Sequence, residues 1–519
     1  MRLRYTALVA LLIVAGPVLA QTEAKLTAPN GMGGFPGDFF GRTVALSGDG
    51  TVALVGAENK LNLQGAAFIY VQENGTWRLQ AELRAPAPAV IDYFGAAVAL
   101  TRDGTLAFVT SRSFTNPAVH VFERAGDAWT LLTSILPATA TPQDQFGNAL
   151  AVSADGSVVL VGAFLSDAAV SNAGAADVFT RSGDTWTESA ELTASDAAQL
   201  ALFGQSVALS GDGAYALVGN GFSDDGGAAY VFARSGDAWT EQALFTSDEI
   251  DVSPQFGQSV ALDGTRAVVG AYNADTVAVQ AGAAYVFDLA GSTWSETAKL
   301  IGSVTHSYQQ VGTAVAVAGD RIVVGAPSST IRSEVGLAYV YALDETWTAT
   351  FRLAASDGQP ADFHGFAVAL SGDRIAVGAP FTDTGASTSG TAYVYDADGA
   401  IPMPAFIAAD AVTIGKADAL VGGLASNGAS TLKKQSNGYS GSYDADVTAT
   451  GAVTVEKRNV VEGNVTAGGL LTLDNAATVT GTAQGNAPVA PGALPSVGPF
   501  TAGTQNQTVN AGETLTLTP

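Results

Sequence analysis

Hydrophobic and polar residues alternate in short runs along most of the chain, with glycine-rich turns between them. The clearest repeat begins with a strand-like alternation at residues 203–209, and a Ser-Gly-Asp-Gly turn follows at residues 210–213. Asp-Gly suits a tight hairpin because it tolerates positive φ. Three more predicted strands follow, at residues 216–219, 228–232 and 239–245. This unit is one antiparallel four-stranded sheet, the size of a propeller blade.

The unit repeats along the chain. The six tryptophans, from Trp77 to Trp347, stand about 52–57 residues apart and each follows a turn-like phrase. A Phe-Gly pair begins the first predicted strand of each repeat and degrades to Val-Gly and His-Gly in the last two. These pairs begin at Phe40, Phe94, Phe146, Phe203, Phe256, Val311 and His364. We therefore expect an all-β fold with a seven-bladed propeller of four-stranded antiparallel blades.

The ends of the repeat region predict how the ring closes. The seventh repeat stops at Asp396 without a tryptophan strand, whereas residues 23–28 match the late fourth strands of other repeats. The first strand of the mature chain is therefore expected to complete the last blade. Such pairing protects two strand edges that would otherwise be exposed.

Phe-Gly followed by Gly-Ala-Pro, as at residues 324–327 and 377–380, resembles the FG-GAP repeat. This repeat is the blade unit of the integrin alpha-chain propeller and of many bacterial surface proteins, and the resemblance covers residues 23–396. It implies a binding or adhesion role. Integrin-type blades often carry a calcium loop, which needs several carboxylates. The corresponding turns here supply one each, as Asp212 does, so no cofactor or metal ligand carries over, although calcium binding is left open.

The remaining segments differ in pattern. Residues 1–20 have a basic start, a short apolar stretch and a small-residue cleavage site, which predicts a signal peptide before a propeller domain at 21–399. Strand-like phrases with a period of about 18 residues predict a short β-solenoid-like segment at 400–487. That segment is similar to bactofilin-type polymer-forming domains. Residues 488–519 form a Pro/Gly-rich linker and the start of a further strand segment.

Composition narrows the functional classes. The formal net charge of −25 disfavours nucleic acid and anionic membranes as partners. The chain has no cysteine, which excludes disulfides and thiolate metal sites. No apolar stretch after the signal is long enough to span a membrane. We expect a secreted or cell-surface protein, and a chain that continues beyond Pro519 is also compatible with the sequence.

Candidate site residues lie in the long connections, after the second strand and between blades, which topology places on one face. Variable loops on a rigid frame commonly carry recognition, although solvated loops without a function are the simpler interpretation. The acids predicted to form a binding face are Asp167, Asp224, Asp225, Asp275 and Asp383. The three histidines, His120, His306 and His364, occupy unrelated positions in the repeat and are expected to be structural or solvated.

Three functions follow from these patterns. The first is an exported, non-enzymatic adhesion module that presents an acidic, loop-rich face to a protein or polysaccharide at the cell surface. The second is a structural envelope protein that self-associates through its C-terminal segment. The third is a propeller hydrolase, which the Val-Ala-Leu first strands disfavour because they predict a small, apolar axis.

Overall fold

The computed structural model divides the chain into two compact units, one of which spans Glu23–Ala400 and the other of which contains Ile401–Pro519. In the first unit the structure describes residues 23–29, 37–138, 141–221, 226–247, 255–276, 279–302, 307–327, 336–382 and 389–396, and after residue 400 it describes the backbone of short strands. The predicted signal peptide lies outside these residues. In the described part of the chain, no helix is both long and apolar enough to cross a bilayer.

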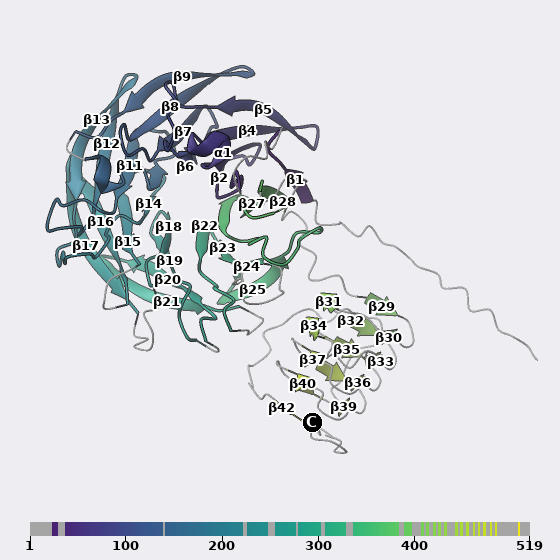
Figure 1. Cartoon of the computed structure of the whole chain (residues 1–519). Coiled ribbons are helices and arrows are strands. Elements are labelled where there is room, and N and C mark those ends of the chain that lie inside the picture. The colour runs from purple at the N-terminus through teal and green to yellow at the C-terminus, as the bar shows by residue number, and fades with distance from the viewer. Residues whose placement is uncertain are drawn as a thin grey trace, which may run out of the picture. The chain divides into compact units, whose positions relative to one another are not determined.

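The described residues of the first unit form seven four-stranded antiparallel sheets around an axis, which confirms the predicted propeller (Figure 1). Blade 1 is β2 (Thr43–Leu46), β3 (Val52–Ala57), β4 (Ala66–Glu73) and β5 (Thr76–Leu83); blade 2 is β6 (Phe94–Leu100), β7 (Leu106–Ser111), β8 (Ala118–Ala125) and β9 (Ala128–Ile135); blade 3 is β10 (Ala149–Val152), β11 (Val158–Ala163), β12 (Ala175–Ser182) and β13 (Thr185–Leu192). Blade 4 is β14 (Ser206–Leu209), β15 (Tyr215–Asn220), β16 (Ala228–Ser235) and β17 (Ala238–Thr246); blade 5 is β18 (Ser259–Asp263), β19 (Arg266–Ala271), β20 (Ala283–Ala290) and β21 (Thr293–Leu300). Blade 6 is β22 (Ala314–Ala318), β23 (Arg321–Ala326), β24 (Leu337–Leu343) and β25 (Trp347–Leu353); blade 7 is β26 (Ala367–Ser371), β27 (Arg374–Ala379), β28 (Thr391–Asp396) and β1 (Glu23–Leu26).

The first strand of each blade is innermost and contacts the first strands of both neighbouring blades. Because the strands are antiparallel, every long connection falls at the same end of its sheet, and we call this end the long-connection face. Two short helical turns lie in these connections, α1 (Lys60–Leu63) and η1 (Pro142–Asp144). The backbone of α1 is left-handed at Leu61 and Asn62, with φ of 55° and 63°.

In six blades the Phe-Gly pair or its counterpart lies just before the first strand, whereas in blade 2 the strand β6 begins at Phe94 itself. The predicted strand began at Phe203, but β14 begins at Ser206 because Gly204 turns the chain with a φ of 89°. A Cβ on Gly204 would lie 2.1 Å from the carbonyl oxygen of Ala175, so only glycine fits this close approach. The phenylalanine of the pair is fully buried, and Phe203 itself packs among side chains of blades 3 and 4.

The hydrophobic core consists of layers between neighbouring blades. The tryptophans span the same boundaries. Trp129 of blade 2 donates its indole N–H to Gln80 of blade 1 at 2.8 Å, and Trp186 of blade 3 packs edge-on against Phe108 of blade 2. A propeller is therefore held together mainly by contacts between blades, and the six tryptophans lie at six of the seven seams.

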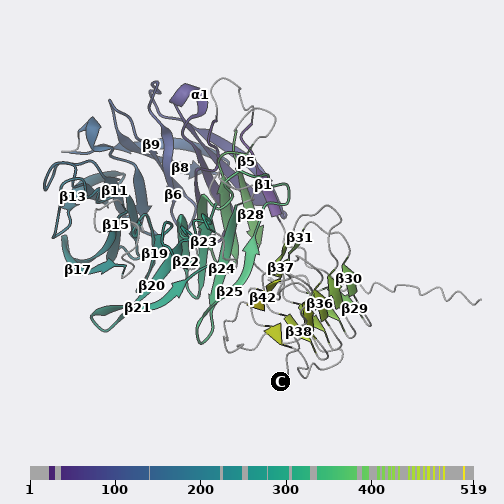
Figure 2. The same cartoon turned by 60° about the horizontal axis from the view of Figure 1, so that its bottom comes forward.

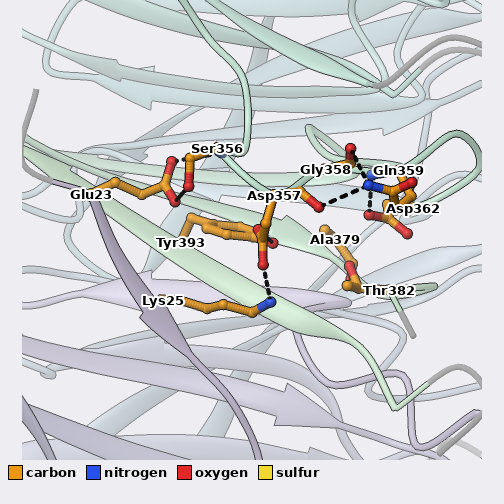
Figure 3. A network of polar contacts seen from close by, with 10 residues as sticks. All are labelled: Glu23, Lys25, Ser356, Asp357, Gly358, Gln359, Asp362, Ala379, Thr382 and Tyr393. Atoms are coloured by element: carbon orange, nitrogen blue, oxygen red, sulfur yellow. Dashed lines mark hydrogen bonds and ion pairs between the residues drawn. The ribbon is translucent and has the colours of Figure 1, made fainter. Parts of the chain in front are cut away.

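The N-terminal strand closes the ring, as predicted. β1 pairs antiparallel with β28, with Glu23 opposite Tyr395 and Leu26 opposite Ala392. Figure 3 shows the polar contacts that fix it: the Glu23 carboxylate accepts hydrogen bonds from the backbone N–H and the hydroxyl of Ser356, and Lys25 forms an ion pair with Asp357. Blade 7 is therefore built from both ends of the propeller segment.

The same contacts link ordinary neighbouring blades. The Ser195 hydroxyl donates to Glu241 at 2.8 Å, and Tyr230 donates to Asp196 at 2.8 Å. At the closure, Tyr393 donates to Asp357 at the same distance, beside the Ser356–Glu23 contact. The closing strand thus occupies the position of a regular fourth strand.

The described strands after residue 400 pair in three sets. The first set is β29 (Phe406–Ala408), β32 (Leu424–Ser426), β35 (Val447–Ala449), β38 (Val465–Ala467) and β41 (Ala483–Gln484); the second is β30 (Val412–Ile414), β33 (Ser430–Leu432), β36 (Val453–Val455) and β39 (Leu471–Leu473). The third is β31 (Ala419–Val421), β34 (Ser442–Asp444), β37 (Val460–Val461), β40 (Thr478–Val479) and β42 (Gln507–Thr508) (Figure 2). Pairing is parallel throughout except between β40 and β42. Val453 stands opposite Leu471, as the predicted repeat aligned them.

Candidate functional site on the long-connection face

Two of the acids predicted to form a binding face close their own loops. Asp167, in the β11–β12 connection, accepts a hydrogen bond from the backbone N–H of Asn172 at 2.7 Å. Asp275, in the β19–β20 connection, accepts one from Gln280 at 2.6 Å. These carboxylates therefore shape the loops, whatever else they contact. The other three acids, Asp224, Asp225 and Asp383, lie outside the described residues.

The aspartates of the tight turns also accept hydrogen bonds from residues of their own turns. Asp212 accepts hydrogen bonds from the Ser210 hydroxyl at 2.6 Å and from the backbone N–H of Ala214 at 3.0 Å, and these bonds lower the pKa of its carboxyl group. The same arrangement recurs at Asp49, Asp103 and Asp155. Among the described residues, no group of three or more metal-binding side chains is placed to hold an ion.

Two buried histidines replace aromatic residues of the repeat. His364, in place of the Phe-Gly phenylalanine, is 0% exposed and contacts the Tyr395 hydroxyl at 2.9 Å, and burial lowers its pKa to about 3. His120 contacts the hydroxyls of Ser111 and Ser134 at 3.2 and 2.8 Å, and burial lowers its pKa to about 4. These contacts are those of structural residues. His306 lies outside the described residues.

A buried acid, Asp177, stands in β12 where the third strands of blades 4 to 7 have a tyrosine. One of its carboxylate oxygens is buried without a hydrogen-bond partner, and it pairs across the sheet with Glu191. Burial, followed by the nearby charge of Glu188, raises the pKa of Asp177 to about 8. The hydrophobic pattern of the sequence does not show that Asp177 is buried, but an alignment of the third strands shows that it replaces a tyrosine.

The position directly after each Phe-Gly pair or its counterpart, at the long-connection end of the innermost strand, is polar in five of the seven blades. We call these seven residues the axial ring: Arg42, Ala96, Asn148, Gln205, Gln258, Thr313 and Phe366. Asn148 of blade 3 donates to the backbone carbonyl of Gln205 in blade 4 at 3.1 Å, so neighbouring members of the ring are in contact.

The strongest charges of this region lie where blades 1 and 2 meet. Glu58, which follows β3 and is only 4% exposed, forms an ion pair with Arg42 at 2.6 Å and a longer one with Arg112 at 3.4 Å. Arg112 follows β7, at the position where blades 3 to 7 have a neutral residue. It also donates to Asn148 of blade 3 at 3.4 Å. One buried carboxylate thus faces two arginines from different blades.

Aromatic rings flank both arginines. The guanidinium group of Arg112 lies 5.2 Å from the ring centre of Tyr93, and that of Arg42 lies 5.2 Å from Phe366. Phe366 continues into a cluster of partly buried rings, which we call the phenylalanine cluster: Phe39, Phe363, Phe366 and Phe381. Guanidinium groups held on aromatic faces are both attracted by the ring and partly shielded from water.

Exposed apolar side chains also concentrate on the long-connection face. Among the described residues, eight of the ten exposed large hydrophobic side chains lie in long connections, and the other two lie in fourth strands. Val170 and Leu200 lie in connections joined by a backbone hydrogen bond from Leu200 to Ser171. Single exposed apolar residues are common, but a concentration on one face is typical of interaction surfaces.

The sequence predicted an apolar axis from the Val-Ala-Leu strands, and that prediction did not cover the mostly polar axial ring, which lies just before those strands in six blades. The residue after each Phe-Gly pair varies from blade to blade, so it carries no periodic signal. A column-by-column comparison of the repeats would have shown charged residues in blades 1 and 2, with Glu58 and Arg112 at equivalent positions.

The repeats match a known protein family. The FG-GAP repeat family matches residues 21–70, 129–179, 186–232, 239–287, 294–341 and 347–395, more than half of the chain. Most of blade 2 lies outside these segments. No curated protein matches. Among solved structures, the WD40 repeats of RRP9 align with a TM-score of 0.49 and 11% identity over 72% of this chain and 97% of that chain. A protein from Lactobacillus plantarum aligns with a TM-score of 0.43 and 16% identity over 64% and 88%. The six matched segments establish that the chain belongs to the FG-GAP repeat family.

Proposed function

We propose that this protein is an exported, non-enzymatic binding module that presents its long-connection face to a partner at the cell surface. The observation that carries the proposal is the concentration of exposed apolar side chains in the long connections. Interface cores are apolar and enriched in aromatic residues and arginine. The phenylalanine cluster and the two arginines add this composition near the axis. The sequence predicts an acidic face, but the two predicted acids that the structure describes, Asp167 and Asp275, accept hydrogen bonds within their own loops.

Substitutions on the two faces test the proposal. Leu200→Arg and Val279→Arg place charge on exposed positions of the long-connection face, and Asp184→Arg and Asp237→Arg do so in tight turns at the other end. Binding of the labelled full chain to intact cells of the producing organism is measured by flow cytometry. We expect at least a tenfold loss for the first pair only. Equal losses for both pairs, or no cell binding by the unsubstituted protein, would refute the proposal.

A second proposal concerns the C-terminal strands, which we infer form a β-solenoid that mediates self-association. Its support is the parallel register of the three strand sets and the spacing of Val453 and Leu471. Solenoid rungs bury their faces on their neighbours and so favour stacking of further copies. Analytical ultracentrifugation of the full chain and of a chain ending at residue 400 gives the test. Identical, monomeric behaviour of both would contradict it.

A further inference from the structure

Arg112 has fewer hydrogen-bond acceptors than its guanidinium group can use. Its two side-chain contacts, to Glu58 and Asn148, are both 3.4 Å long, beyond the usual range for such bonds. Its Nε atom is buried without an acceptor. A guanidinium group carries five N–H donors in a planar fork that matches a carboxylate. The side chain is 21% exposed, so a ligand can reach it from solvent.

The charge balance of the two arginines also favours an anionic ligand. Glu58 is the one carboxylate with which both Arg42 and Arg112 form ion pairs in the described part of the chain, so this cluster keeps one positive charge. The whole chain has a formal charge of −25, which makes this spot unusual. One excess positive charge suits a singly charged carboxylate better than a doubly charged phosphate group, which Glu58 would repel.

The neighbouring side chains hold the arginines in place. Tyr93, beneath Arg112, has a left-handed backbone with φ of 49°, and its N–H donates to the carbonyl of Leu63 in the turn of α1. Arg42 lies against Phe366, which belongs to the phenylalanine cluster. Fixed guanidinium groups lose less conformational entropy when they bind a ligand than flexible ones do.

We propose that Arg42 and Arg112 bind the carboxylate of an acidic side chain of a partner protein, while an adjoining apolar side chain of that partner packs on the phenylalanine cluster. This inference rests on the proposed function, since it locates the binding spot within the long-connection face. The phenylalanine cluster offers a purely apolar surface, which suits an apolar side chain next to the acidic residue of a peptide segment, and an acidic polysaccharide is the alternative that the test distinguishes. Arginine and aromatic residues also dominate the energetics of protein interfaces.

Selection from a random dodecapeptide phage library on the immobilised full chain tests the proposal. We expect enriched peptides with Asp or Glu next to apolar residues. In fluorescence anisotropy their affinity should fall at least tenfold for Arg112→Gln and for Arg42→Gln, and less for Arg112→Lys, which keeps the charge but not the fork. Arg181→Gln is the matched control, because Arg181 also lies against an aromatic ring, that of Trp186, but belongs to the tight-turn end. Phe381→Ala should weaken the same peptides.

The outcomes separate this inference from the proposed function. The inference would be overturned if the selected peptides contained no acidic residues, or if they bound Arg112→Gln as tightly as the unsubstituted protein. If Arg112→Gln does not fold, the same comparison is made with Arg112→Lys. Failure to select any peptide, or arginine-dependent binding of oligogalacturonate alone, would overturn the assignment to a protein partner. Cell binding that is lost with Leu200→Arg but retained with Arg112→Gln would leave the proposed face intact and exclude the arginine site.

Discussion

Replacing Asp177 with asparagine is expected to stabilise the protein at neutral and alkaline pH and to change little at pH 4. The side chain is 1% exposed, and burial raises its pKa from 3.8 to about 8. A raised folded-state pKa means that the stabilising contribution of the group is complete below the unfolded-state pKa and is lost as the pH rises through the folded-state pKa. Asparagine has nearly the same shape and does not ionise, so it avoids this loss.

The magnitude follows from the size of the shift. One pKa unit corresponds to about 1.4 kcal/mol, so the ionisable acid lowers the free energy of unfolding by about 4 kcal/mol at pH 7, and the effect levels off above pH 8. Urea unfolding followed by tryptophan fluorescence from pH 4 to pH 9 measures the difference. Asp184→Asn, whose side chain is 75% exposed in the same blade, is the control. A difference between Asp177→Asn and the unsubstituted protein that does not grow with pH would refute the reasoning.

Three further predictions concern the repeat. His364→Phe restores the Phe-Gly pair. Because the pKa of His364 is lowered to about 3, the unsubstituted protein loses stability as the pH falls from the unfolded-state pKa of 6.5 towards 3. The variant should therefore be about 3 kcal/mol more stable at pH 4 and similar in stability at pH 7. Acid titrations followed by circular dichroism measure the difference. Gly204→Ala, which meets the Ala175 carbonyl, should lower the melting temperature far more than Gly183→Ala, whose Cβ meets nothing within 4 Å; equal shifts would contradict the close approach. Leu26→Ala and Leu192→Ala both remove buried leucines of outer strands, and each should lower the free energy of unfolding by about 2–4 kcal/mol in urea. In stopped-flow experiments the unfolding rate should rise more for Leu26→Ala, because Leu26 belongs to the closing strand. An equal rise for both variants would argue that opening of the closure does not limit unfolding.

The periodic features of the fold were predictable from the sequence. Tryptophan and Phe-Gly recur at one position of each repeat because each blade meets its neighbours in the same way, so their spacing predicted seven blades. The match between residues 23–28 and other fourth strands predicted the pairing of β1 with β28. Both predictions use repetition, which survives substitutions in any single blade.

The candidate site was not predictable in the same way, because a site differs from the repeat. Arg42, Glu58 and Arg112 occupy variable positions, and no alternation of polar and apolar residues shows that side chains from blades 1 and 2 meet. The predicted acids Asp167 and Asp275 have the composition of a binding face, but their carboxylates are used within their own loops. Asp177 resembles any other acid in the sequence, and only its position in the sheet reveals that it is buried.

The closure of the ring by β1 has a consequence for synthesis. β1 leaves the ribosome first, whereas its partner β28 ends at Asp396, after every other strand of the propeller. Six blades can pack as they emerge, but the circle cannot be completed cotranslationally until the seventh appears. Until then the opening segment has a free edge, and the nascent protein must keep that edge from pairing with another chain. The contact that locks the finished ring is therefore also the last contact between strands that the growing propeller can make.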